Sequence, residues 1–412
     1  MGKIRIAVNL AVAAAVVSLA ALPVARAAAM RPNNDDYLQD GVTAIVNGGF
    51  PGAWAMDSNG ATGAAGLANL NTGNPQHPTQ ATDPAMALRI GSLTKSFVAT
   101  VVLQLVASGQ LGLDDPITNY LPAGLLPNAG GVTVRQVLQH TSGLPEYWEG
   151  GTDPQLVHFV TDPSYRTRTW TPTQILGLIR SQPLNFAPGS KVEYSDTNYI
   201  VAGMIVQAVT HHSAQYEVQQ RIIRPLHLAR TYFPTTDSSI PFFHANGYSY
   251  AVDDSGNIVV TSLQQLAADP SRNFTNYNPS ILGTMGAMIS TPQDLNTFYA
   301  ALLGGQLLPH NANPAKDMNV QMKQTVPLHQ AGWPAGLGMG LGIWSWDLSQ
   351  ILPACHQTVY GHEGEAPGYD AWAFGDASGH KTIAMGVNLM IPNIQAYAAT
   401  ELPTYVSLWC KP

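Results

Sequence analysis

Strand-type and helical patterns are unevenly distributed along this chain of 412 residues, and that distribution limits the fold more than any other feature. The runs "GAWAMD" and "GAAGLANL" near the N-terminus predict strands, and strand signals return from "GLGIWSW" to "TIAMGVNLM". Between Ser92 and about Ile281 the patterns are mostly helical, and a last helical run, "NIQAYAATELPTYVSLW", follows the final strands. Strands from both ends with helices inserted between them predict an α/β (α+β) fold, in which one sheet flanked by helices carries a helical lobe.

For three helices, the sequence indicates where at least one end lies. We predict a helix near Tyr37–Asn47 and a long helix from "TNYIVAG" that Pro225 stops. A third begins at "STPQDL", with Pro292 in its first turn, and closes on Gly304–Gly305. No linker or repeat divides the chain, so we expect a single domain over 28–412, with a sheet lobe at about 33–91 and 282–412 and a helical lobe at about 92–281.

The first 27 residues have the pattern of a secretory signal peptide. Lys3 and Arg5 precede an apolar run, and an Ala-x-Ala type cleavage site ends at Ala27. A membrane anchor is the weaker alternative, because Asn9 interrupts the apolar run and Pro23 ends it. No other segment is long and apolar enough to span a bilayer. We therefore expect a secreted or periplasmic protein.

Charge and cysteine content fit this location. Without the leader, 16 basic residues face 26 acidic ones, a net charge near −10, which does not suit binding to nucleic acid or anionic lipid. Outside the cytoplasm two cysteines are expected to pair, so Cys355 and Cys410 predict a disulfide that holds the C-terminus. Two buried thiols are the alternative.

A Ser-x-x-Lys pattern occurs twice in the chain. Ser92 and Lys95 stand at the start of an apolar helical run, where residues at i and i+3 share a face. Ser378 and Lys381 stand in the polar run "GDASGHKT" between two strand patterns, which predicts a hairpin turn with solvated side chains. For Ser92 the plain alternative is a helix cap, with a lysine that extends to the surface.

Two further stretches favour a catalytic reading of the first pair. "VEYSDTNYIVAG" contains Tyr194 and Asp196 just before a helix, and "VYGHEGEAPGYDAWAF" contains His362, Glu363 and Gly364 in a strand. Taken alone, each fits a packed tyrosine or a surface histidine. In this order, with about 100 and about 170 residues between them, the three motifs resemble the serine penicillin-recognising family, which includes DD-peptidases, class C β-lactamases and related esterases and amidases. The stretches "HTSGL", "APGSKVEYSDTNY", "HANGY" and "STPQDL" extend the resemblance, which is greatest to the secreted D-alanyl-D-alanine carboxypeptidase/transpeptidase of actinomycetes, including its cysteine pair.

The resemblance implies a role for each residue. Ser92 would be the nucleophile and Lys95 its base, since a serine hydroxyl is a weak nucleophile without an adjacent base. Tyr194 would relay a proton to the leaving group. The backbone N–H groups of Ser92 and Glu365 would form the oxyanion hole, and Gly364 would leave room for substrate along the strand.

Three departures from the family bear on the substrate. Asp196 stands where the family often has Asn, and Glu363 and Glu365 replace threonines that hold a terminal carboxylate in the carboxypeptidase. Trp344 aligns with the arginine that completes that carboxylate pocket. Strand alternation puts both glutamates on one face, towards the cleft, where they would repel a free carboxylate. In the alternative, both glutamates turn outward to solvent.

Together these features predict a secreted serine hydrolase that acts through an acyl-Ser92 intermediate on D-amino-acid peptides or amides. Alternatives are a class C-like β-lactamase, a small-ester esterase, and a non-enzymatic sensor that binds muropeptides or penicillins. The partner would be a small-molecule or peptide substrate, a β-lactam included. No cofactor is implied, and the histidines at 211, 212, 356 and 362 lack metal-site spacing.

Overall fold

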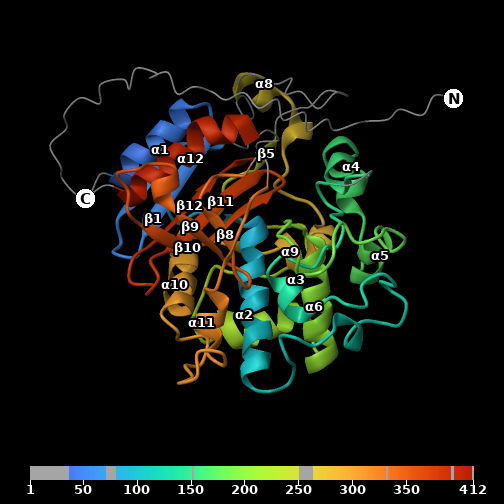
Figure 1. The fold of residues 1–412 in the computed structure, drawn as a ribbon. Helices are drawn as coiled ribbons and strands as arrows, with labels where there is room; N and C mark the ends of the chain where they lie inside the picture. Colours follow the sequence, from blue (N-terminus) through green and yellow to red (C-terminus); the bar gives the residue numbers. More distant parts are fainter. Residues whose placement is uncertain are drawn as a thin grey trace.

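The structure is a computed structural model that describes residues 37–70, 80–150, 153–249, 263–330, 333–390 and 394–410. The predicted signal peptide lies outside the described residues. A nine-stranded antiparallel sheet forms the centre, and strands from both ends of the chain meet in it where β1 pairs with β12. This confirms the predicted architecture (Figure 1). The strands in spatial order are β3 (Gln80–Ala81), β2 (Thr62–Asn69), β1 (Gly52–Asp57), β12 (Thr382–Val387), β11 (Tyr369–Gly375), β10 (Thr358–Ala366), β9 (Trp344–Asp347), β8 (Leu337–Met339) and β7 (Val326–Pro327).

Short strand pairs and helices complete the fold. The pairs are β4 (Leu88–Arg89) with β6 (Ile289–Ser290), and β5 (Tyr248–Ser249) with β13 (Leu389–Met390). The helices are α1 (Tyr37–Asn47), α2 (Thr94–Ala107), α3 (Val134–Leu138), α4 (Gln155–Thr161), α5 (Pro172–Gly177), α6 (Thr197–Thr210), α7 (Ala214–Val218), α8 (Leu263–Ala268), α9 (Gly283–Gly286), α10 (Pro292–Leu303), α11 (Met318–Met322) and α12 (Ile394–Cys410).

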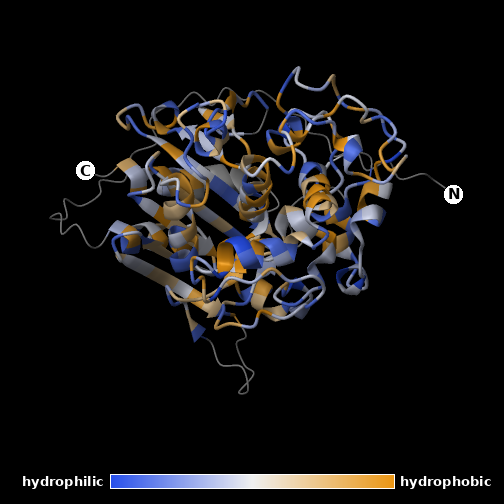
Figure 2. Cartoon of the chain, turned by 90° about the horizontal axis from the view of Figure 1, so that it is seen from below, coloured by the Kyte–Doolittle hydropathy of each residue, from blue (hydrophilic) through white to orange (hydrophobic). Residues whose placement is uncertain are grey.

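Helices cover both faces of the sheet. On one face α1 packs against α12 and against β1 and β2, and a hydrophobic cluster fills that space. On the other face α10 packs against β11 and β12, and a second cluster continues into the helical region around α2 and α6 (Figure 1). Hydrophobic and hydrophilic segments alternate along the surrounding helices and loops, as Figure 2 shows. The apolar α2 is buried on almost every side, as its composition predicts.

The prediction of one continuous helix up to Pro225 is wrong in one respect, because the helix is interrupted after Thr210. α6 ends at Thr210, and His211 adopts a left-handed backbone with φ 60°. Ser213 then caps α7 by accepting a hydrogen bond from the Tyr216 N–H at 3.2 Å. The helical segment continues to Ile223, two residues before Pro225. A left-handed residue followed by a serine cap ends one helix and starts another, which apolar periodicity does not reveal.

The second Ser-x-x-Lys copy lies in the β11–β12 hairpin, as predicted. The Ser378 hydroxyl is exposed and donates to Asp376 Oδ1 at 2.6 Å. Lys381 differs from the prediction, because it is not simply solvated. Its Nζ lies 4.9 Å from the centre of the Trp409 ring, where burial lowers the pKa of the ammonium group. The side chain therefore supports packing of α12 rather than catalysis.

The chain end is joined to the sheet region by a disulfide between Cys355 and Cys410, with Cα atoms 5.2 Å apart. This pairing is the predicted one. Within the described ranges, no helix has both the length and the apolar character needed to cross a bilayer.

Candidate active site

The predicted nucleophile lies in a tight turn that leads into α2. Ser92 is the middle residue of the short 3-10 helix Gly91–Leu93, and α2 starts immediately afterwards. The residue that precedes α2 is Leu93, which makes no side-chain cap. Ser92 is therefore not the helix cap that the plain alternative requires.

Glycines on both sides let strand β10 approach this turn closely. Gly91 has a left-handed backbone, with φ +48°, and an added Cβ would lie 2.1 Å from the Glu365 carbonyl oxygen. A Cβ on Gly364 would lie 2.1 Å from the Ile90 carbonyl oxygen. No side chain fits at either position. The Ser92 turn and the β10 backbone thus meet where the resemblance expects the oxyanion hole.

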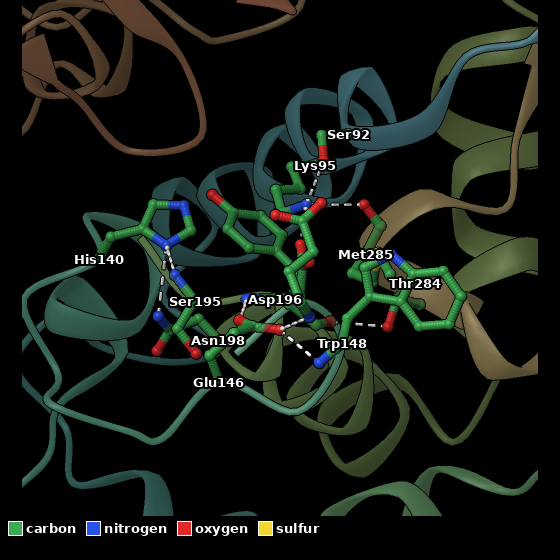
Figure 3. Close-up of polar contacts among 12 residues, drawn as sticks. Ser92, Lys95, His140, Glu146, Trp148, Ser195, Asp196, Asn198, Thr284 and Met285 are labelled. Atoms are coloured by element: carbon green, nitrogen blue, oxygen red, sulfur yellow. Dashed lines mark hydrogen bonds and ion pairs between the residues drawn. The ribbon is translucent and has the colours of Figure 1, made fainter. Parts of the chain in front are cut away.

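Lys95 is fully buried beneath Ser92. Its Nζ donates to Ser92 Oγ at 2.7 Å and to the Met285 carbonyl oxygen at 2.9 Å. It also forms an ion pair with Asp196 Oδ1 at 2.6 Å (Figure 3). With an exposed fraction of 0% for its side chain, Lys95 does not extend to the surface. A buried lysine that touches a serine hydroxyl is the arrangement that an activated nucleophile needs.

Asp196 pairs with Lys95 and does not cap the helix that it precedes. It stands just before α6 but makes no capping bond, and no hydrogen bond reaches Oδ1 apart from its ion pair with Lys95. Its backbone N–H donates to the Glu146 carboxyl group, which also accepts from the Trp148 N–H at 2.5 Å. Burial, followed by the Asp196 charge, raises the pKa of Glu146 to about 8. Near neutral pH, Glu146 is therefore mostly protonated and adds little charge.

Tyr194 covers the lysine. The centre of its ring lies 5.0 Å from Lys95 Nζ and 4.3 Å from the stacked ring of His140. Burial, followed by the charge of Asp196, holds the pKa of the Tyr194 hydroxyl well above its ordinary value, and a hydrogen bond with Ser92 opposes this rise. Tyr194 is thus a neutral hydroxyl beside the nucleophile, which suits proton transfer.

The ring of His140 stacks on that of Tyr194; the sequence reasoning quoted this histidine only within "HTSGL" and gave it no role. It has a left-handed backbone, with φ 56°, and its Nδ1 accepts the Ser195 N–H at 3.1 Å. Burial, followed by the Lys95 charge, holds the pKa of His140 well below its ordinary value. The neutral ring therefore orients the segment before α6 without adding charge to the site.

His362 lies on β10 next to the same group of rings. The ring centres of Tyr194 and Trp344 are 6.2 and 4.4 Å away, respectively. Its Nδ1 contacts the backbone carbonyl of Glu363. Burial, followed by the Lys95 charge, lowers the pKa of His362 to about 3, so the ring is neutral at physiological pH.

A cavity of about 360 Å³ lies over the nucleophile, and several of the predicted site residues line it. Ser92, Tyr194, Asp196, Trp344, Glu363 and Glu365 all line it. The two glutamates are partly exposed at its wall, so they face the cavity, as strand alternation predicts. Restricted hydration, followed by nearby carboxylates, raises the pKa of both glutamates well above the ordinary value. The remaining lining residues are Trp148, Glu149, Leu156, Met285, Trp333, Pro334, Leu337, Trp346, Asp370 and Trp372.

The sequence reasoning missed several residues at this site. Glu146 and Glu149 follow the quoted stretch "HTSGL", and their acidic character was the available signal. Asp370 is the second residue of β11 and lies directly opposite Glu365, which pairing of the two strand patterns could have placed. No sequence signal marks the carbonyl of Met285, because a backbone group can make such a contact whatever the residue type.

Comparisons with known proteins agree with this geometry. The Beta-lactamase family model matches residues 31–402. A D-stereospecific amidohydrolase from Streptomyces sp. is 32% identical, with a TM-score of 0.72 over 89% of this chain and 98% of that one. A D-amino acid amidase from Ochrobactrum anthropi SV3 is 24% identical and has the same fold, with a TM-score of 0.72 over 91% of this chain and 97% of that one.

Curated relatives match over shorter segments. The putative penicillin-binding protein PbpX of Bacillus subtilis is 26% identical over 227 residues, which is 55% of this chain and 48% of that protein. Protein flp of Staphylococcus aureus is 30% identical over 158 residues, which is 38% of this chain and 30% of that protein. The matched segments thus span less than half of either relative. With a family match over most of its length and a Ser-Lys-Tyr group at the cavity, the chain belongs to the β-lactamase family of serine hydrolases.

Proposed function

We propose that this protein hydrolyses amide bonds of D-amino-acid amides and short D-amino-acid peptides through an acyl-Ser92 intermediate. The observation that carries the proposal is the fully buried Lys95 ammonium nitrogen 2.7 Å from Ser92 Oγ, at the floor of a cavity large enough for such a substrate. Burying a lysine costs free energy, so its contact with Ser92 indicates a role in the chemistry of that serine. The predicted signal peptide supports action outside the cytoplasm.

The contacts of Lys95 suggest the order of proton transfers. At rest Nζ donates to Ser92, Met285 and Asp196, so its three donor positions are used. Before it can accept the Ser92 proton, it must release one of its own, and the Asp196 carboxylate at 2.6 Å is the contacting group that can take it. Ser92 Oγ then attacks the carbonyl carbon while its proton moves to Nζ.

Tyr194 would complete the first half-reaction. Its neutral hydroxyl interacts with Ser92 and can donate its proton to the departing amine nitrogen. The resulting phenolate recovers a proton from the Lys95–Asp196 pair. Water then hydrolyses the acyl-Ser92 ester, which returns the serine proton and releases the D-amino acid.

Two observations support this choice of substrate. The 32% identical relative with matching coverage is a D-stereospecific amidohydrolase. The cavity wall carries Glu363 and Glu365, which oppose the carboxylate of a peptide that ends in free D-Ala. We therefore expect uncharged amide substrates to be cleaved better than free acids.

The test combines labelling with turnover. A fluorophosphonate or a penicillin should add its mass to the peptide that contains Ser92, and Ser92→Ala should abolish both the adduct and turnover. The activity panel is D-Ala-D-Ala-NH₂, D-Ala-D-Ala, the L-amide, nitrocefin and p-nitrophenyl acetate. The proposal requires the D-amide to have the highest kcat/KM; a higher value for nitrocefin or for the acetate ester would establish a β-lactamase or an esterase instead.

A further inference from the structure

The sheet side of the active-site cavity presents three carboxyl groups on two neighbouring strands. Glu363 and Glu365 project from β10, and Asp370 projects from β11. In the strand register Glu365 is opposite Asp370 and Glu363 is opposite Trp372, so all four side chains share one face. All four line the cavity that Ser92 lines. We call Glu363, Glu365 and Asp370 the acidic wall.

Tryptophans line the same cavity as the acidic wall. The faces of their rings are electron-rich and attract organic cations, so rings beside carboxylates suit an ammonium or guanidinium group. The indole N–H of Trp344 is a second sign that the cavity takes a ligand; it can only donate, so its partner would be an acceptor such as a substrate amide oxygen and not the cation. This side chain is only 4% exposed and lies at the cavity, yet its N–H has no hydrogen-bond partner among the described residues. The lining tryptophans are Trp148, Trp333, Trp344, Trp346 and Trp372.

Without a ligand, the charge in this part of the cavity is unbalanced. Among the residues described, no ion pair joins Glu149, Glu363 or Glu365 to a basic side chain, and no lysine or arginine lines the cavity. Restricted hydration, followed by repulsion between the carboxylates, raises the pKa of the two wall glutamates above the ordinary value, and Glu363 shares a hydrogen bond with Asp370. A bound cation would reverse this, because it stabilises the ionised carboxylates. These side chains are not arranged as a metal site in the part of the chain that the structure describes.

The acidic wall lies on the side of the cavity where the leaving group would depart. Tyr194 is the proposed proton donor to the leaving amine, and its ring lies 5.2 Å from Trp333 and 6.3 Å from Trp344. Glu363 follows His362 on β10, whose ring centre lies 6.2 Å from that of Tyr194, and Glu363 and Tyr194 line the same cavity. An amine protonated by Tyr194 would therefore extend between these tryptophans towards the wall.

We propose that the acidic wall and its tryptophans form a leaving-group subsite for a cation. The preferred substrates are then D-aminoacyl amides or peptides whose leaving amine carries a second group, an ammonium or guanidinium, a few bonds from the scissile nitrogen. This inference rests on the proposed function, because it assumes an acyl-Ser92 intermediate and a leaving amine near Tyr194.

Three D-alanyl amides of equal length test the subsite directly. Their leaving amines end in an ammonium, a methyl or a carboxylate group: the 4-aminobutyl, pentyl and 4-carboxybutyl amides. We expect kcat/KM for the aminobutyl amide to exceed that for the pentyl amide by about tenfold or more, since one carboxylate or cation–π contact contributes on the order of that ratio. The carboxybutyl amide should be the poorest of the three.

The readout in variants is the ratio of two substrates on one enzyme, so a general loss of activity does not affect it. Glu363→Gln combined with Glu365→Gln keeps the shape of both side chains and removes both charges, and should reduce the aminobutyl-to-pentyl ratio to about two or less. Asp114→Asn removes a carboxylate that pairs with Arg135 at the surface, outside the cavity, and should keep the wild-type ratio.

Each outcome decides the question. Equal wild-type rates for the aminobutyl and pentyl amides, with Ser92 acylated by both, would overturn the subsite and leave the proposed function intact. A cation preference that survives loss of both glutamates would place the cation elsewhere and also overturn it. If none of the amides acylates Ser92, the proposed function fails and this inference fails with it.

Discussion

Removing the Asp196 carboxylate should reveal how strongly it holds Lys95. The two charged atoms are 2.6 Å apart, and the side chains are 0% and 5% exposed. At an effective dielectric constant of about 20, their attraction is about 6 kcal/mol, which opposes the loss of hydration of both ions. When one partner of such a buried pair is removed, the uncompensated charge typically reduces the free energy of unfolding by about 3–5 kcal/mol. We expect Asp196→Ala to reduce stability by that amount at pH 7.

One effect opposes this loss. Burial, followed by the Asp196 charge, raises the pKa of Glu146 to about 8, so removal of that charge also relieves a repulsion. At pH 7, however, Glu146 is mostly protonated and little repulsion is present to relieve. The loss of the lysine partner therefore dominates.

Urea unfolding of four proteins at pH 7 measures the effect. These are the wild type, Asp196→Ala, the double variant Lys95→Met with Asp196→Ala, and Asp114→Ala as the control. The Asp114–Arg135 pair is exposed, with side-chain fractions of 77% and 32%, so its loss should reduce stability by about 1 kcal/mol or less. The double variant should be more stable than Asp196→Ala alone, because it leaves no unpaired buried charge. If Asp196→Ala loses no more stability than the control, or if the double variant is no more stable than Asp196→Ala alone, the pair does not stabilise the fold as argued.

Three further predictions concern the site and the chain end. Lys95→Ala should slow acylation of Ser92 by several orders of magnitude, and Tyr194→Phe should slow it by about 10²–10⁴-fold, because each variant removes a step in one proton path. Near-normal rates with Tyr194→Phe on an amide substrate would refute the relay. Reduction of the Cys355–Cys410 disulfide should reduce thermal stability without abolishing acylation, measured by a melting curve and by a mass adduct on the same sample. The pKa of Glu146 is raised in the folded state, so its contribution to stability is complete below about pH 4.5 and is lost as the pH rises to about 8. The wild type should therefore lose more stability than Glu146→Gln between pH 5 and pH 8, and parallel curves would contradict this.

Much of the fold could be predicted because the signals are local. Alternation in "GAWAMD" and "TIAMGVNLM", and the capped helix at Pro292, each depend on residues a few positions apart. The break at His211 escaped prediction, because a left-handed residue is chosen by its backbone surroundings and not by apolar periodicity. Local patterns therefore predict where helices and strands lie, but not where a helix is interrupted.

At the site, the sequence by itself determined which residues could do the chemistry. The spacing of Ser92 and Lys95 on one helix turn, and the alternation of Glu363 and Glu365 on one strand, are short-range geometric facts that residue order settles. Only the tertiary structure decided what surrounds them. It brings Asp196 and the carbonyl of Met285 to the lysine, from segments far away in the chain. The charge balance of the cavity depends on such distances and on burial, because both set the energy of a charge, and neither is written in residue order.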